Sequence, residues 1–171
     1  MRLVHPRSVR GGFSLLEVAA AIAIVGVGLT ALMVAVGSNT RVNDAGNRLT
    51  QGVALAQEIR EWTCALPFSD PDPGDGDNPP GPDGSDPQAF VDDLDDLMDV
   101  TYSPPRDGQG QPIADLVGWS QTLTLSWRDP DDLTAELSAG SSDYICVTVD
   151  VEFKGEPVAQ GTWLVTRSAG Q

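Results

Sequence analysis

The stretch that decides the fold is Gly12-Phe13-Ser14-Leu15-Leu16-Glu17, which opens an apolar run that ends at Gly37. Within residues 13–37 the only charged residue is Glu17. About 20 apolar residues are enough to cross the hydrocarbon core of a bilayer, so this run predicts a membrane-spanning helix. A charge at membrane depth costs about 2.5–3.5 kcal/mol on insertion scales, and we therefore take Glu17 as a candidate functional residue.

Residues 1–12 form a basic leader that contains Arg2, Arg7 and Arg10. The apolar run that follows is long for the core of a secretory signal peptide, and no Ala-x-Ala-like cleavage site comes after it. Basic residues before a span favour a cytoplasmic N-terminus, so we expect residues 38–171 on the exported side of the membrane.

Residues 38–66 continue the helix as an amphipathic half. Apolar residues recur at spacings of three or four, as in Leu49, Val53, Ala56 and Ile59. This period predicts a helix with one face packed on another element. Pro67 is expected to end it.

Residues 67–115 are predicted to be an acidic loop rich in Pro and Gly, with one short helix over Ala89–Val100. We expect the aspartates of that helix on its wet face; they are Asp92, Asp93, Asp95, Asp96 and Asp99.

Three loop aspartates, Asp72, Asp75 and Asp77, are the candidate calcium ligands, because Ca²⁺ takes carboxylate oxygens. Their spacing departs from the calcium-binding loop of an EF-hand, which favours a solvated acidic loop and leaves calcium binding as the alternative. We therefore predict no metal and no other cofactor.

Residues 116–171 change to a period of two, which predicts antiparallel strands over Trp119–Trp127, Tyr144–Phe153 and Val158–Thr166. Lys154-Gly155-Glu156 supplies a turn between the last two. One face of such a sheet is apolar, and the amphipathic half of the long helix is expected to cover it. The predicted fold is α+β, a long N-terminal helix packed on a small antiparallel sheet.

The two cysteines, Cys64 and Cys146, allow one disulfide in an exported domain. Two separate thiols are the alternative, because the alternation along Tyr144–Phe153 turns Cys146 away from the Ile/Val row. The sequence thus predicts a bridge between Cys64 and Cys146 and leaves this alternative open.

Composition excludes two classes of function. A formal charge of −15 disfavours direct binding to nucleic acid, which relies on Lys and Arg at phosphates. The only histidine is His5, in the leader, and no Ser-His-Asp set or Gly-rich nucleotide motif is present. We predict that the protein is not an enzyme.

The junction Arg10-Gly11-Gly12-Phe13-Ser14-Leu15-Leu16-Glu17-Val18 resembles the N-terminal signature of type IV pilin-like proteins, which include the pseudopilins of type II secretion systems. The segment Ala54–Arg60 also resembles the helix of the minor pseudopilins called the V or I type. This resemblance covers the first third of the chain; beyond Leu66 it rests on the order of helix and sheet alone.

The resemblance implies that a prepilin peptidase cuts between Gly12 and Phe13 and that the new Phe13 amine is methylated. It also implies that Glu17 pairs with the Phe13 amine of a neighbouring subunit during assembly on an inner-membrane platform. The implied partners are other major and minor pilins or pseudopilins.

Two details refine the position of the chain within that family. Major pilins often carry a proline in the apolar span, and this chain has none. Tip subunits of the secretion pseudopilus typically lack the Glu, so Glu17 favours a minor subunit beneath the tip. The alternative function is an uncleaved, single-pass anchor whose exported part binds a ligand.

Overall fold

The computed structural model describes residues 14–70, 80–82 and 90–167. A single α-helix, α1 (Leu15–Ala65), begins the described chain. The chain divides into two compact units within this helix, between Ala45 and Gly46. The absence of proline from residues 13–66 lets the hydrogen-bonded ladder run without a break, and the helix ends two residues before Pro67.

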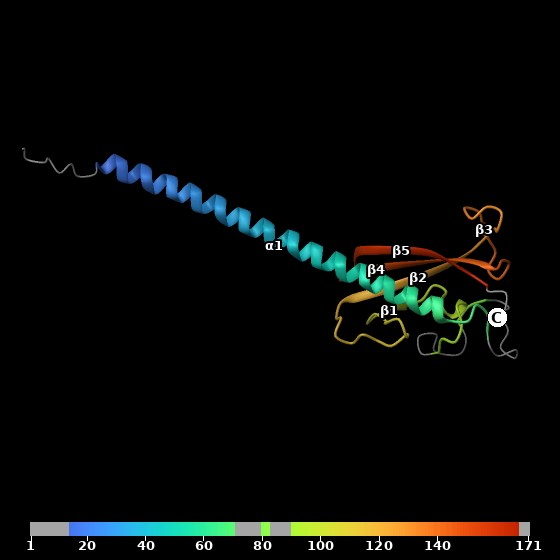
Figure 1. Ribbon diagram of the computed structural model, residues 1–171. Helices are drawn as coiled ribbons and strands as arrows, with labels where there is room; N and C mark the ends of the chain where they lie inside the picture. Colours follow the sequence, from blue (N-terminus) through green and yellow to red (C-terminus); the bar gives the residue numbers. More distant parts are fainter. Residues whose placement is uncertain (1–13, 71–79, 83–89, 168–171) are drawn as a thin grey trace, which may run out of the picture. The chain divides into compact units, whose positions relative to one another are not determined.

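The second unit contains the last turns of α1 and an antiparallel sheet of five strands. The three long strands are β2 (Trp119–Arg128), β4 (Tyr144–Phe153) and β5 (Glu156–Thr166). Two short strands, β1 (Thr101–Tyr102) and β3 (Glu136–Leu137), pair with opposite ends of β2. The order is β1-β2-β4-β5, so β5 is an edge strand (Figure 1). All three predicted strands are confirmed.

The hairpin between β4 and β5 has a two-residue loop, Lys154-Gly155, because Phe153 pairs with Glu156. Both loop residues have positive φ, 56° and 79°. This conformation is that of the hairpin turns whose twist matches the flanking strands, and Gly155 adopts it without steric cost.

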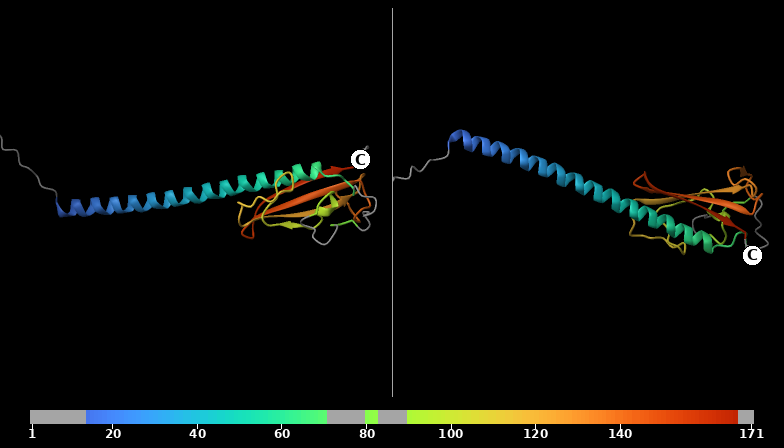
Figure 2. Two further views of the ribbon diagram at one scale, coloured as in Figure 1. Left: turned by 90° about the horizontal axis from the view of Figure 1, so that it is seen from below. Right: turned by 45° about the horizontal axis from the view of Figure 1, so that its top comes forward.

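The core of the second unit lies between the sheet and the last four turns of α1, which run along one sheet face (Figure 2). Leu55, Ile59 and Trp62 supply the helix side of it. Alternate residues of β2 and β4 supply the sheet side and are fully or nearly fully buried, among them Leu123, Leu125, Val147 and Val149. A two-residue period on the sheet and a three-to-four-residue period on the helix thus bury one face of each.

A buried amide joins three segments within this core. The Gln121 side chain of β2 donates to the carbonyl oxygens of Leu55 at 2.9 Å and Arg106 at 3.2 Å, and it accepts from the Arg106 N–H at 2.7 Å. Gln121 is 0% exposed. Because each of its polar atoms has a partner, its burial positions the loop around Arg106 against both helix and sheet.

The predicted helix over Ala89–Val100 was wrong in extent. Within its described part, residues 90–100, a three-residue 3₁₀ turn, η1 (Asp95–Leu97), is the only helical element. The Asp93 carboxylate accepts from the N–H groups of Asp95 and Asp96, and the Asp96 carboxylate accepts from those of Asp92 and Asp93. Such side chain to backbone bonds compete with a helical ladder.

The expected wet face was wrong for the same reason. Asp93, Asp95 and Asp96 are buried, because their oxygens bind backbone N–H groups, including that of Gly81 to Asp95 at 2.6 Å. Burial, the hydrogen bond to Asp95 and the charge of Asp95 together raise the pKa of Asp93 from 3.8 to about 8.

Candidate assembly site

The start of α1 is capped by Ser14. Its hydroxyl oxygen accepts from the Glu17 N–H at 3.2 Å, and its carbonyl accepts from the N–H groups of Glu17 and Val18 at 3.0 and 3.2 Å. A helix leaves its first N–H groups without intrahelical partners, and a serine at this position satisfies one of them. The helix therefore begins at a defined residue, directly after the apolar segment begins.

Glu17 lies three residues after the cap, in the first turn of α1. The series Ser14-Leu15-Leu16-Glu17 has the spacing of a capping box, and a carboxylate in the first turn interacts favourably with the helix dipole. Among residues 14–70, 80–82 and 90–167, no side chain pairs with the Glu17 carboxylate. The role of Ser14 was missed from the sequence, although Ser-x-x-Glu is its signal.

The apolar part of α1 is uncovered by the rest of the described chain. Leu15 is 90% exposed, and the large aliphatic side chains from Leu16 to Val36 are also exposed. The helix contains a window with a mean hydropathy of 2.5, none of it buried, and is long and apolar enough to cross a membrane. A soluble protein rarely exposes a continuous apolar surface of this kind, so this surface has to meet lipid or other helices.

One face of this segment carries mostly small residues. They recur at spacings of three and four and are Ala23, Gly26, Val27, Thr30, Ala31, Val34, Ala35 and Ser38. The Thr30 hydroxyl donates to the Gly26 carbonyl at 2.8 Å, which satisfies it inside the apolar stretch. Small side chains let helix backbones approach closely, so this face suits helix–helix packing in an apolar environment.

The proposed cut and the proposed methylation fall on Gly12 and Phe13, which lie outside the described residues. The calcium candidates Asp72, Asp75 and Asp77 lie outside them as well. Within the part of the chain that the structure does describe, no group of three or more His, Cys, Asp or Glu side chains is placed to hold a metal ion.

The predicted disulfide is absent. Cys64 and Cys146 are both free thiols. Cys64 is exposed on α1. Cys146 alternates with the buried residues Ile145 and Val147, so its side chain lies on the sheet face opposite the helix. The absence of the bridge agrees with the alternation along β4, which argued against it.

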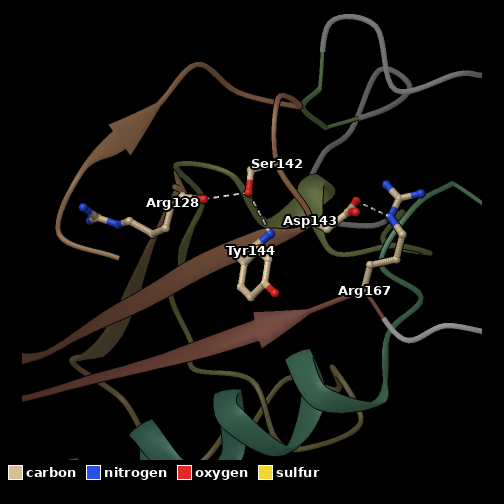
Figure 3. Close-up of polar contacts among 5 residues, drawn as sticks. All are labelled: Arg128, Ser142, Asp143, Tyr144 and Arg167. Carbon is tan, nitrogen blue, oxygen red and sulfur yellow. Dashed lines mark hydrogen bonds and ion pairs between the residues drawn. The ribbon is translucent and has the colours of Figure 1, made fainter. Parts of the chain in front are cut away.

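A cluster of polar residues lies at the end of the sheet where β2 ends and β4 begins (Figure 3). The Ser142 hydroxyl donates to the Arg128 carbonyl at 2.6 Å and accepts from the Tyr144 N–H at 3.1 Å. Arg167 pairs with Asp143 at 2.9 Å. Both partners of that pair are largely in solvent, which makes it a weak surface interaction. The Ser142 contacts tie a loop to the ends of β2 and β4, and the Arg167–Asp143 pair joins the residues that flank β5 and β4, so the cluster is a structural connection.

Comparison with known proteins bears on the start of the chain. Residues 7–33 match the family model of the prokaryotic N-terminal methylation motif. No curated protein and no solved structure matches the chain. The motif coincides with the capped start of α1 and with its exposed apolar half, and the second half of α1 packs on an antiparallel sheet. The chain carries the prepilin-type N-terminal methylation motif and has a pilin-like arrangement of a long N-terminal helix and an antiparallel sheet.

The matched motif covers most of the apolar half of α1 and none of the half that packs on the sheet. The methylation motif belongs to chains that a prepilin peptidase processes and that assemble with other pilins. Members of this family are generally structural and not enzymes. The apolar helix is consistent with residence in the inner membrane before assembly.

Proposed function

We propose that this pilin-like protein is a minor subunit, pilin or pseudopilin, of a type IV pilus-like or type II secretion filament. It is held in the inner membrane with a cytoplasmic N-terminus, cut by a prepilin peptidase, and moved into the filament by the assembly platform. Its role there is to start or shape the filament beneath the tip.

The observation that carries this proposal is the coincidence of the methylation motif with a helix whose apolar half nothing in the described chain covers. An anchor needs only lipid around that half. The face of small residues from Ala23 to Ser38 favours a filament subunit over a simple anchor, because close packing of helices requires small residues and contact with lipid does not.

The chemistry of the junction follows from charge. Cleavage after Gly12 frees the Phe13 amine, and a glycine lets the scissile backbone approach catalytic groups closely. The Glu17 carboxylate, without a partner side chain among the described residues, then meets the Phe13 ammonium of a neighbouring subunit. Pairing the two charges lowers the cost of holding either one in an apolar surrounding.

The position beneath the tip is proposed from Glu17 itself. Tip subunits typically lack this carboxylate, and a subunit that keeps it retains its means of pairing with a neighbour's amine. In this view the sheet is the exported surface of the filament.

Mass spectrometry of the membrane-extracted protein tests the processing step. We expect a mature chain that begins at Phe13 and carries one methyl group on its amine. A chain that begins at Met1 in cells with an active peptidase would instead support the uncleaved anchor.

Variants at Glu17 test assembly separately from processing. Glu17→Gln and Glu17→Ala should insert and be cleaved normally but should be lost from purified filaments. Glu61→Ala is the matched control, because Glu61 is an exposed glutamate on the same helix. Normal incorporation of Glu17→Ala would refute the pairing.

A further inference from the structure

Among residues 14–70, 80–82 and 90–167, no strand lies beside the outer edge of β5, so most of that edge is open to pairing. β5 is the last strand of the sheet, and its pairing with β4 is regular from Ala159 to Thr166. The devices that usually protect an edge are confined to its start, where Pro157 and an irregularity at Val158 lie. From Val158 to Thr166 the strand has no charged residue. Its unpaired backbone groups are a template for another strand.

A groove runs beside this edge, between β5 and the last turns of α1. Its volume is about 220 Å³, and it is lined by Ala56, Gln57, Arg60, Gly161, Thr162 and Trp163. The absence of a side chain at Gly161 brings the strand close to the helix, since a Cβ there would lie 3.4 Å from the Ala56 Cβ.

Helix and strand run side by side in the same direction along the groove. A Cβ at Gly52 would lie 2.8 Å from a Val158 methyl group, and further along the Trp163 indole N–H donates to the Thr63 hydroxyl at 3.1 Å. Gly52 therefore lies beside Val158 and Ala159, with Val53 the next residue along the helix, and Arg60 lines the groove together with Trp163.

The flank of the groove is apolar at one end and cationic at the other. Leu49 and Val53 are 52% and 47% exposed. Arg60 is exposed and is the one charged group among the described residues that line the groove. In a chain with a formal charge of −15, a groove with a cation and no carboxylate favours a negatively charged occupant.

We propose that the groove binds an extended segment of a different polypeptide, which adds to β5 as a sixth strand. Its side chains alternate, so two residues four apart face α1 together. The residue opposite Ala159 is apolar and covers Val53. The residue opposite Trp163 is acidic and pairs with Arg60. Main-chain hydrogen bonds to β5 supply affinity, and these two positions supply specificity.

A second copy of this chain fits the groove less well. At the other side of the sheet, β1 and β3 are only two residues long and offer a poor strand to pair with β5. If β5 paired with β5 of a second copy around Thr162, the two positively charged Arg60 side chains would lie close to each other. The lining residues of neither copy supply a carboxylate there.

The experiment uses the full chain in lipid nanodiscs and a displayed library of nine-residue peptides. We expect selection of peptides with an apolar and an acidic residue four apart. Arg60→Glu should weaken them by about tenfold or more and should instead select Lys or Arg at the acidic position. Arg41→Glu, an equal change of charge on the same helix outside the groove, should leave binding unchanged.

Two further measurements locate the selected peptide. Hydrogen exchange of the amides in Ala159–Thr166 should slow when it binds. N-methylation of the alternate peptide residues whose N–H groups point toward β5 should abolish binding. N-methylation of the other residues, whose N–H groups point away, should be tolerated. The proposal is overturned if no peptide is enriched, or if N-methylation of both sets is tolerated equally. It is also overturned if the preference for an acidic residue survives Arg60→Glu, or if the chain self-associates through β5. None of these outcomes bears on N-terminal processing, so the filament proposal is tested independently.

Discussion

Replacing Gln121 with leucine tests whether one buried amide holds the helix, the sheet and the Arg106 loop together. Three hydrogen bonds of 2.7–3.2 Å disappear, two to Arg106 and one to the Leu55 carbonyl. A typical intramolecular hydrogen bond contributes about 0.5–1.5 kcal/mol, and a buried group that loses its partner costs about 1–3 kcal/mol. The Leu55 carbonyl can keep its bond within α1, so the loss is concentrated at Arg106.

The extra apolar burial of leucine offsets about 1 kcal/mol of this loss. We therefore expect Gln121→Leu to lower the free energy of unfolding by about 2–3 kcal/mol. At about 3 °C per kcal/mol for a unit of this size, the unfolding midpoint falls by roughly 6–9 °C.

The assay is thermal unfolding of the full chain in detergent, followed by tryptophan fluorescence. Gln160→Leu is the matched control, because Gln160 is exposed on β5 and bonds only to Asp150 in solvent. Its effect should stay within about 0.5 kcal/mol. If Gln121→Leu unfolds at the wild-type midpoint, the amide does not hold the three segments together and our account of the loop is wrong.

Three further outcomes follow from the described contacts. Because Asp93 stays protonated to about pH 8 when folded but ionises near 3.8 when unfolded, stability should fall as pH rises from 4 to 8. Asp93→Asn, which keeps a donor toward Asp95, should reduce the pH dependence of the unfolding free energy by up to about 1.4 kcal/mol per pH unit, measured by urea unfolding. An unchanged pH dependence would contradict this prediction. Gly110→Ala should cost roughly 2–4 kcal/mol, since its φ is +74° and a Cβ would lie 2.6 Å from the Trp62 ring. Gly155→Ala is the control, because Gly155 has a φ of +79° but a Cβ there would meet nothing within 4 Å, so it should cost only the backbone strain. Equal losses of stability in the two variants would exclude the clash with Trp62. Thiol titration of the unfolded chain without reductant should detect two free thiols, Cys64 and Cys146. Detection of no free thiol would show that the two cysteines form a disulfide.

Most of the fold follows from patterns that one segment carries by itself. The helix and the three long strands were predictable because an apolar period of 3.6 or 2 reports which face of an element is buried, whatever it packs against. The C-terminal end of α1 was predicted for a local reason too, since Pro67 cannot continue a helix. The Ser14 cap is just as local, but it was missed.

The acidic region was misread because local composition does not report burial. Asp93, Asp95 and Asp96 have the charge of a solvated face, yet they are buried because backbone N–H groups of nearby turns come to their oxygens. Those partners include Gly81, fourteen residues away from Asp95. No pattern within the segment signals such a contact.

The sequence by itself determined the two characters of the helix, and it alone carries the proposed site of processing. The Gly12-Phe13 junction, Glu17 and the apolar run are neighbours along the chain, so their chemistry needs no tertiary fold. Only the tertiary structure decided that Cys64 and Cys146 stay apart, that Gln121 joins three segments, and that β5 borders a groove with Arg60. Each of these depends on which face of the sheet the helix covers and in which direction it runs, and distant residues meet only after that packing is complete.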